Sequence, residues 1–326
     1  MGPGPLAVTM GDPAGIGPEI TTKAWLALRD TPYRFFVIAD PGLYPNIALL
    51  DRPEQAAARF ADALPVLPID SPAAKAGKPD AGLAGPILKS IKYALRFAEN
   101  GQAAGIITNP IAKHVLYEAG FSHPGHTEFL ADLTNTPLPV MMLSARDLNV
   151  ALVTIHMALK DVANSICAVS VINTARILDQ ALRRDFGISS PRIAMCGLNP
   201  HAGENGALGD EEQNILIPAA QTLRAEGINI TNPKPADTMF HAEAREEYDA
   251  ALAMYHDQGL IPVKSLDFHG GVNTTLGLPV IRTSPDHGTA FDIAGKDIAR
   301  PDSLIAAIKQ AAHMAACRKQ YDAGHA

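Results

Sequence analysis

The sequence predicts an α/β protein built from two α/β/α domains with mostly parallel sheets. Short apolar runs alternate with longer amphipathic stretches, and this alternation is typical of strand–helix–strand units. Unusual polar residues gather where the apolar runs end, as they do at the ligand-binding edge of a parallel sheet. The length of 326 residues is enough for two domains of ordinary size.

Each predicted strand corresponds to a short apolar run. We expect strands in seven segments: 6–11, 34–40, 104–110, 149–156, 192–201, 251–257 and 278–288. Helices are expected over 85–101 and 171–187, because apolar residues recur there every three or four positions and each stretch closes on glycine. Residues 64–82, rich in proline and alanine, are predicted to be a surface excursion.

Composition and charge argue against several classes of protein. The net charge is −7 and no stretch is densely basic, which argues against nucleic-acid binding. No apolar run approaches the length of a membrane span, and the first residues do not follow a signal-peptide pattern. The three cysteines, Cys167, Cys196 and Cys317, lie in apolar settings without a close pair, so we expect buried thiols and a cytoplasmic protein.

Three histidines follow apolar runs in the same way: His156, His201 and His256. Their wide spacing matches no short metal motif, so two interpretations stay open. They are either three separate hydrogen-bonded histidines or the ligands of one divalent metal ion with open coordination positions. Asp257, beside His256, could orient a ligand or act as a base.

A second group of polar residues suits a phosphate monoester. Lys264, Asn273 and Arg282 follow one another through a glycine-rich region, and His126 and Thr127 stand just ahead of a predicted helix. Cationic, amide and hydroxyl donors near a helix N-terminus are typical of phosphate sites. The alternative is that the lysine and the arginine are ordinary solvated surface residues.

A glycine-rich segment, GDPAGIGPEI at 11–20, follows the first predicted strand and opens a helix. Gly15 and Gly17 indicate a strand–turn–helix whose backbone lies close to a ligand. The segment is not the G-x-G-x-x-G dinucleotide fingerprint, so an ordinary Rossmann domain is not expected.

Several long motifs in order resemble the 4-hydroxythreonine-4-phosphate dehydrogenase family of vitamin B6 biosynthesis. They are GDPAGIGPEI, PGHTEFLADL, GLNPHAGE, PADTMF, AMYHDQGLIPVK and NTTLGLPVIRTSPDHGTAFDIAGK, and the resemblance runs from about residue 6 to about residue 310. Residues 11–19 and 287–296 are also similar to segments of isocitrate and isopropylmalate dehydrogenases. The resemblance implies a fold like theirs, with an active-site cleft between domains formed by 1–125 plus 295–326 and by 126–294.

The resemblance also implies a reaction and a set of site residues. NAD or NADP oxidises the C3 hydroxyl of 4-phosphohydroxy-L-threonine, and loss of CO2 gives 3-amino-2-oxopropyl phosphate. One divalent metal ion per site (Zn, Mg or Co) is implied, in a homodimer whose subunits share their active sites. The implied roles are metal binding by His156, His201 and His256; substrate binding by His126, Thr127, Lys264, Asn273 and Arg282; catalysis by Asp237, Asp257 and Lys264; and cofactor binding by Gly15, Gly17, His287 and Asp292.

The sequence departs from the family pattern at Ile155, Ala158 and Ala207. These positions border a predicted metal ligand and a loop. The chemical identity of the substrate at its non-phosphate end therefore stays open. One alternative is the same chemistry on threonate or erythronate 4-phosphate. A further alternative is a phosphometabolite-binding or acyltransferase-like protein of the same fold, whose chemistry would not need the three histidines.

Overall fold

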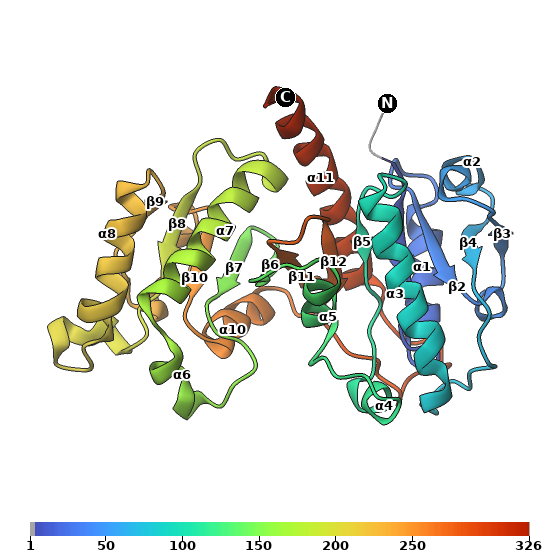
Figure 1. Ribbon diagram of the computed structural model, residues 1–326, viewed down its shortest axis with the longest axis horizontal. Coiled ribbons are helices and arrows are strands. Elements are labelled where there is room, and N and C mark those ends of the chain that lie inside the picture. The colour runs from blue at the N-terminus through green and yellow to red at the C-terminus, as the bar shows by residue number, and fades with distance from the viewer. Residues whose placement is uncertain (1–3, 326) are drawn as a thin grey trace. The chain divides into compact units, whose positions relative to one another are not determined.

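The computed structural model describes residues 4–325, which form two compact units (Figure 1). Unit 1 contains the described residues up to Pro137 together with Leu278–Lys319. Unit 2 contains Leu138–Gly277 with the described residues after Lys319. These boundaries differ from the predicted ones, because the chain leaves unit 1 after residue 137 rather than 125 and returns at 278 rather than 295.

Unit 1 is a parallel sheet with helices. Its strands stand in the order β3-β4-β2-β1-β5-β12, and each neighbouring pair is parallel. The strands are β1 (Leu6–Thr9), β2 (Phe35–Ala39), β3 (Ile47–Leu49), β4 (Leu64–Pro68), β5 (Ile106–Ile107) and β12 (Arg282–Pro285). The helices are α1 (Gly17–Leu28), α2 (Ala56–Arg59), α3 (Ala84–Glu99), α4 (Lys113–Glu118), α5 (His126–Leu133), most of α11 (Asp302–Gly324), and the short 3-10 helices η1 (Pro41–Leu43), η2 (Pro53–Gln55) and η3 (Ala81–Leu83).

Unit 2 has a mixed sheet in the order β11-β6-β7-β10-β8-β9. The pairs β11–β6 and β6–β7 are antiparallel, and the other pairs are parallel. The strands are β6 (Val140–Ala145), β7 (Leu148–Leu152), β8 (Arg192–Met195), β9 (Asn229–Ile230), β10 (Ala250–Ala253) and β11 (Val272–Leu276). The helices are α6 (Leu159–Ser165), α7 (Ala168–Phe186), α8 (Ile217–Ala225), α9 (Ala242–Arg245), α10 (His256–Leu266), the 3-10 helices η4 (Pro200–Gly206) and η6 (Ala236–Thr238), and the π-helical turn η5 (Glu212–Leu216).

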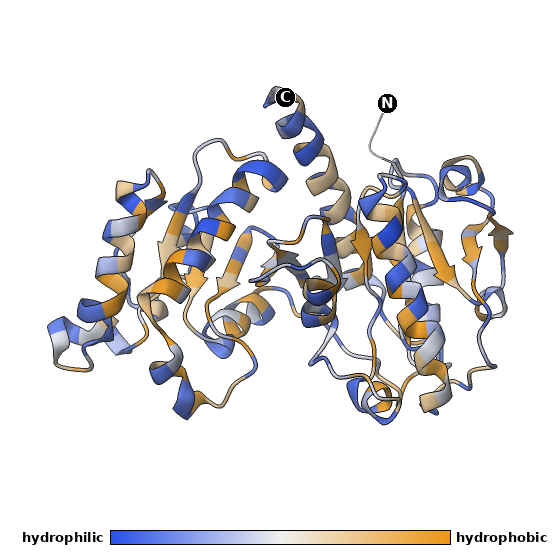
Figure 2. Cartoon of the chain, viewed as in Figure 1, coloured by the Kyte–Doolittle hydropathy of each residue, from blue (hydrophilic) through white to orange (hydrophobic). Residues whose placement is uncertain are grey.

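The sheet of unit 2 is covered on both faces. Alternate strand residues point to opposite faces, so Leu252 of β10 packs with α7 and α8 while Ala251 and Ala253 pack with α10. Figure 2 shows largely apolar strands and helices in which apolar and polar residues are mixed. This arrangement confirms the predicted α/β class with mostly parallel sheets.

All seven predicted strand segments contain or overlap a strand, and both predicted helices form, as α3 and α7. Gly187 ends α7 in the left-handed region with φ of 72°, the conformation that a glycine C-cap supplies. Two predictions were wrong. The surface excursion predicted for 64–82 was wrong for residues 64–68, which form strand β4, because a position between β2 and β3 buries even a proline-rich run; residues 70–82 are exposed or partly exposed. Among the cysteines only Cys196 is buried, since Cys167 is exposed before α7 and Cys317 is partly exposed on α11.

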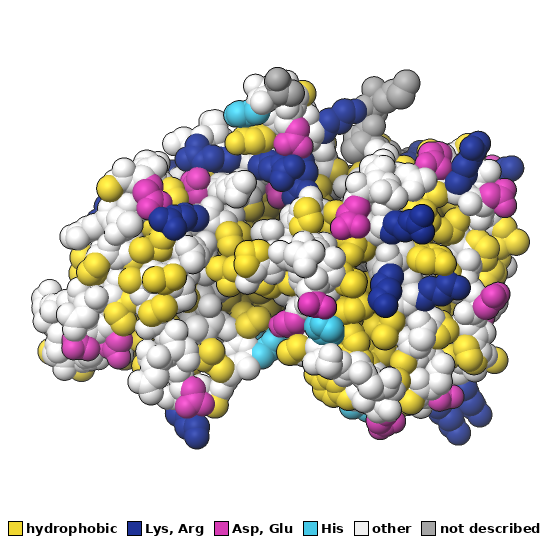
Figure 3. All heavy atoms as spheres, viewed as in Figure 1, with side chains coloured by type: hydrophobic (Ala, Val, Ile, Leu, Met, Phe, Trp, Pro, Cys, Tyr) yellow, Lys and Arg dark blue, Asp and Glu magenta, His cyan; other side chains and the backbone are white. Residues whose placement is uncertain are grey.

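Two surface properties bear on the classes considered from the sequence. Basic and acidic side chains are interspersed on the face shown in Figure 3, which carries no continuous basic field. Among residues 4–325, no helix combines the length and the apolar character that a bilayer crossing requires.

The packing of α10 against β7 depends on Gly259. A Cβ atom at this position would lie 2.5 Å from Leu152 Cδ2 and 3.0 Å from Val150 Cγ1. We expect Gly259→Ala to lower the free energy of unfolding by about 1–3 kcal/mol through overpacking. Gly85→Ala in α3 is the control, because a Cβ there meets nothing within 4 Å, and it should change the same quantity by less than about 1 kcal/mol. Urea denaturation of both variants measures the free energy of unfolding. Equal effects of the two substitutions would contradict overpacking at Gly259.

Candidate functional site

Three neighbouring parallel strands of unit 2 each end just before one of the predicted metal histidines. β7, β10 and β8 lie side by side, and His156, His256 and His201 follow their carboxyl ends. Ligands bind at this edge in open parallel sheets. The sequence-based expectation that these polar residues share one edge therefore matches the positions of the three strands.

Side-chain hydrogen bonds hold the three strand ends together. Thr154, after β7, donates from Oγ1 to the carbonyl of Met254 at 2.7 Å. Gln258 accepts from the Met254 backbone N–H at 2.7 Å and donates to the Gly197 carbonyl, also at 2.7 Å. The segments that follow β7, β10 and β8 are thus linked to one another beyond the regular ladder, and these segments carry the histidines.

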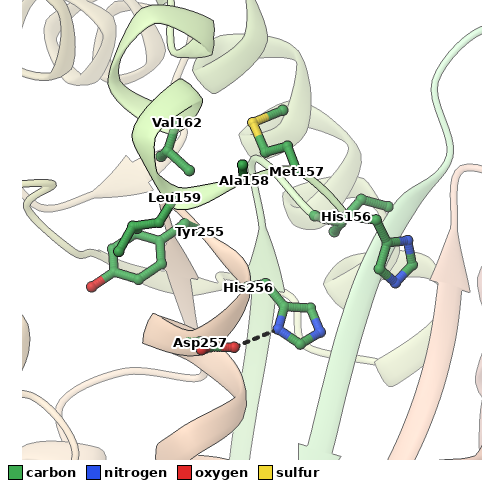
Figure 4. Close-up of a pocket in the computed structure, with 9 residues that line it drawn as sticks. His156, Met157, Ala158, Leu159, Val162, Tyr255, His256 and Asp257 are labelled. Atoms are coloured by element: carbon green, nitrogen blue, oxygen red, sulfur yellow. Dashed lines mark hydrogen bonds and ion pairs between the residues drawn. The ribbon is translucent and has the colours of Figure 1, made fainter.

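His156 and His256 come close together. Their ring centroids are 5.9 Å apart, and both line a pocket of about 530 Å³ with Ile155, Met157, Ala158, Leu159, Val162, Tyr255 and Asp257 (Figure 4). His256 is the first residue of α10, and its Nδ1 lies 2.7 Å from Asp257 Oδ1. A ring held by a carboxylate at Nδ1 presents Nε2 to a ligand, as metal-binding histidines commonly do.

His201 lies apart from that pair. Its side chain is 67% exposed, and its Nδ1 lies 3.1 Å from Glu204 Oε2. Within the described part of the chain, no three or more His, Cys, Asp or Glu side chains are grouped so that they could hold a metal ion. A single chain therefore brings two of the predicted metal ligands together, and the third sits on a separate turn.

That turn has an unusual backbone. Residues 201–205 all have positive φ angles, between 45° and 79°, so they form a short left-handed turn within η4. Four of the five are not glycine, and a left-handed conformation costs roughly 1–2 kcal/mol for each such residue. Strain of this kind persists only where surrounding contacts impose it, and it concentrates at functional sites.

A buried carboxylate supplies those contacts. Glu212 is 2% exposed, and its Oε1 accepts from the backbone N–H groups of Leu198 and Asn199, each at 2.8 Å. Its Oε2 accepts from Asn199 Nδ2 at 2.9 Å. A Cβ at Gly203 would lie 2.6 Å from Glu212 Oε2, so the turn packs directly on this carboxylate. Glu212 begins the π-helical turn η5, a rare element that often marks functional sites.

The predicted catalytic and substrate residues of unit 2 are dispersed. Lys264 on α10 lines a second pocket, of about 390 Å³, which shares His256 and Asp257 with the first. Its Nζ lies 5.6 Å from the ring centroid of Phe268. Asn273 on β11 has a buried Oδ1 that accepts no hydrogen bond from residues 4–325. Asp237 is exposed in η6, beside a separate pocket lined by Lys234, Thr238, Met239, His241, Glu243, Ala244, Glu247 and Tyr248.

Unit 1 holds a buried cation. Arg282 on β12 is 3% exposed, and its Nε and Nη2 atoms both donate to Thr108 Oγ1, at 3.1 and 2.7 Å. Burial lowers the pKa of Arg282 to about 10, against an opposing effect of Glu128. The guanidinium therefore stays charged at neutral pH, and the threonine hydroxyl fixes its plane.

His126 begins α5 in the same unit, with Thr127 next to it. Burial holds the pKa of His126 well below its ordinary value, and the positive charges of Arg282 and Lys113 act in the same direction. The imidazole is therefore neutral at physiological pH. Its Nε2 is buried and makes no hydrogen bond with any residue that the structure describes.

The backbone of the glycine-rich turn at 11–20 lies close to another segment of the protein, at Thr289. A Cβ at Gly15 would lie 2.8 Å from the Thr289 carbonyl oxygen, which accepts from the backbone N–H of Ile16 at 2.9 Å. Gly17 begins α1 and packs against the Met10 carbonyl. The turn thus docks on the segment that carries His287, whose Nδ1 lies 3.0 Å from the Gly288 carbonyl, and Asp292, which is exposed.

The pyridoxal phosphate biosynthetic protein PdxA family model matches residues 33–311, most of the chain. The chain belongs to this family. A curated relative from Caulobacter vibrioides, named 4-hydroxythreonine-4-phosphate dehydrogenase, is 54% identical over 328 residues and spans 96% of this chain and 98% of the relative.

Solved structures agree with the PdxA assignment. The 4-hydroxythreonine-4-phosphate dehydrogenase of Klebsiella pneumoniae is 39% identical with a TM-score of 0.86, covering 96% of this chain and 99% of that one. The terephthalate 1,2-cis-dihydrodiol dehydrogenase of Burkholderia xenovorans is 28% identical with a TM-score of 0.66, covering 95% and 98%. The PdxA fold thus also occurs in a dehydrogenase whose name specifies another substrate.

Sequence reasoning missed the residues that support the predicted site residues. Thr108, Glu204, Glu212 and Gln258 contact predicted site residues or the backbone that carries them. Gln258 and Glu204 lie two and three residues after predicted metal histidines, so local proximity could have found them. Thr108 and Glu212 act across the fold, and no sequence spacing shows that.

The neutral state of His126 predicts a pH effect. An unfolded histidine has a pKa of about 6.5, so below that pH the unfolded chain binds more protons than the folded one. Stability is therefore lost as the pH falls from about 7 toward 5. Denaturation at pH 8 and pH 5 should show a larger loss for the native protein than for His126→Gln. The same pH dependence in both would contradict the buried neutral state.

Proposed function

We propose that the chain is an NAD- or NADP-linked 4-hydroxythreonine-4-phosphate dehydrogenase. The observation that carries this proposal is 54% identity, over nearly the whole of both chains, to a relative of that name. C3 of 4-phosphohydroxy-L-threonine would lose a hydride to the nicotinamide and its hydroxyl proton to a base. The resulting β-keto acid would lose CO2, and protonation of the remaining carbon would give 3-amino-2-oxopropyl phosphate.

We assign one divalent metal ion (Zn, Mg or Co) to His156, His201 and His256. Two of these rings are held at Nδ1 by a carboxylate, which fits the pattern in which Nε2 binds metal. Such an ion is a Lewis acid toward the oxygen on the carbon that is oxidised. Asp257 then orients His256 rather than acting as the base.

We assign proton transfer to Lys264 in preference to the two carboxylates. Lys264 shares a pocket with His256, whereas Asp257 is already hydrogen-bonded to that ring. Asp237, exposed in η6, is the second candidate. Gly15, Gly17, His287 and Asp292 remain our proposed cofactor residues, and the docking of Gly15 on Thr289 supports a role for the glycines in shaping that segment.

We assign substrate binding, including contacts to the phosphate, to Arg282, His126, Thr127, Lys264 and Asn273. A buried guanidinium held in one plane by Thr108 suits bidentate recognition of a phosphate. The unsatisfied atoms of His126 and Asn273 support these assignments, because buried polar atoms usually find a partner.

We propose a homodimer with shared active sites. Several large apolar side chains beside the two pockets are well exposed, among them Leu159 at 71% and Phe268 at 70%. Grouped exposed apolar residues mark interaction surfaces.

Activity on defined substrates tests the proposed function. With NAD or NADP, purified enzyme should produce absorbance at the wavelength of the reduced cofactor from 4-phosphohydroxy-L-threonine, and much less from threonate or erythronate 4-phosphate. A chelator should abolish this signal and added metal should restore it. A preference for threonate or erythronate 4-phosphate would favour the alternative substrate. Acyl transfer without reduction of the cofactor would favour the acyltransferase-like alternative.

Arg282→Ala tests the phosphate assignment. Loss of hydrogen bonds to a charged group costs about 1.5–3 kcal/mol each, so KM for the phosphorylated substrate should rise roughly tenfold to a hundredfold. Steady-state kinetics measures this, and Lys309→Ala, a surface cation of α11, serves as the control. An unchanged KM in a folded Arg282→Ala enzyme would show that the phosphate binds elsewhere.

Mixing inactive variants tests the shared site. We expect the alanine variants of His156, His201 and His256 each to be inactive alone. If two ligands come from one chain and the third from its partner, two of the three pairwise mixtures should regain activity, to at most about half the native level per mixed dimer. Failure of all three mixtures, in proven mixed dimers, would contradict sharing of these ligands.

A further inference from the structure

Two carboxylates contact the left-handed turn at 201–205 or the residues just before it, and their partners differ. Glu212 is buried beneath the turn. It accepts hydrogen bonds from the backbone N–H groups of Leu198 and Asn199, which precede the turn. Glu204 lies on the exposed side, with its Oε2 3.1 Å from His201 Nδ1. One carboxylate therefore contacts the backbone and the other contacts the imidazole.

We infer that Glu212 and Glu204 are positioning residues for His201. Glu212 binds the backbone at Leu198 and Asn199 and packs on Gly203, so it supports the left-handed turn that begins at His201, whose side chain is exposed. Glu204 fixes the ring and leaves Nε2 as the nitrogen available to a metal ion. The inference rests on the proposed metal role of His201.

The same turn is coupled to the segment that carries His256. Gln258 bonds both the Gly197 carbonyl, ahead of the turn, and the Met254 N–H, ahead of His256. A Cβ at Gly197 would lie 2.9 Å from Ala202 Cα and 3.2 Å from Glu212 Oε1, so this strand end is packed closely on the turn. The position of His201 is therefore fixed relative to the end of β10 as well as locally.

Metal affinity of the full chain, measured with Co2+ as the probe, tests the inference. Metal-free protein is titrated with Co2+, and the dissociation constant is obtained from visible absorbance and from competition with a chelator. Glu212→Gln places an amide donor where Oε2 accepts from Asn199 Nδ2, and Glu204→Gln removes the carboxylate charge beside the His201 ring. Each should weaken Co2+ binding by roughly tenfold to a hundredfold, the usual effect of losing such a contact.

The matched control is Glu243→Gln. Glu243 lies in α9, and its Oε2 is 3.0 Å from Nδ1 of His241, the residue before that helix. The change therefore removes a similar carboxylate–imidazole contact away from the turn. Its Co2+ affinity should stay within about twofold of native. Thermal unfolding of each metal-free variant shows whether it is folded. If Glu212→Gln does not fold, Glu204→Gln carries the test, because the Glu204 side chain is exposed.

His201→Ala separates the two possible failures. If His201→Ala binds Co2+ as tightly as the native protein, the metal role of His201 fails, and the inference fails with it. If His201→Ala weakens binding while folded Glu204→Gln and Glu212→Gln bind normally, the metal role stands and the positioning role is overturned. Lower thermal stability of Glu212→Gln with unchanged Co2+ affinity would likewise overturn it, since that is the effect of a merely structural residue.

Discussion

The parallel alignment of β7, β10 and β8 is the constraint on which the candidate site depends. Three strands that run in the same direction end at one edge of the sheet, and each then continues into a segment that carries a histidine. The backbone of Met254 links the edge, because it bonds to the side chains of Thr154 and Gln258. Residues far apart in the sequence are placed by the sheet rather than by a local motif.

The backbone that carries the histidines at this edge is relaxed at His256 and strained at His201. His256 begins an ordinary helix, and its neighbour Asp257 orients it within one turn. His201 instead stands on a left-handed turn that packs on the buried carboxylate of Glu212. In unit 1, Thr108 performs a comparable task for Arg282, since one hydroxyl accepts from two guanidinium nitrogens. Buried or strained functional groups are thus each held by a dedicated neighbour.

Much of the fold could be predicted from hydrophobic periodicity. The central strands and the two long helices, α3 and α7, are strongly patterned, and their segments were found. β4 was missed because prolines suggested a loop, and β11 was missed because its sequence, VNTTL, is not an apolar run. For the site, residue type and position at strand ends selected the histidines. The left-handed turn could not be predicted, because it depends on Glu212, a residue whose burial and contacts exist only in the folded chain.

A metal-bound crystal structure tests the central claim most directly. Crystals of the full chain grown with Co2+ and recorded at the cobalt absorption edge locate the ion by its anomalous signal. The account predicts one ion per site, bound by Nε2 atoms of His156, His201 and His256 at about 2.0–2.2 Å, with His201 still on its left-handed turn. An ion bound at other residues, or one held without these histidines, would contradict it.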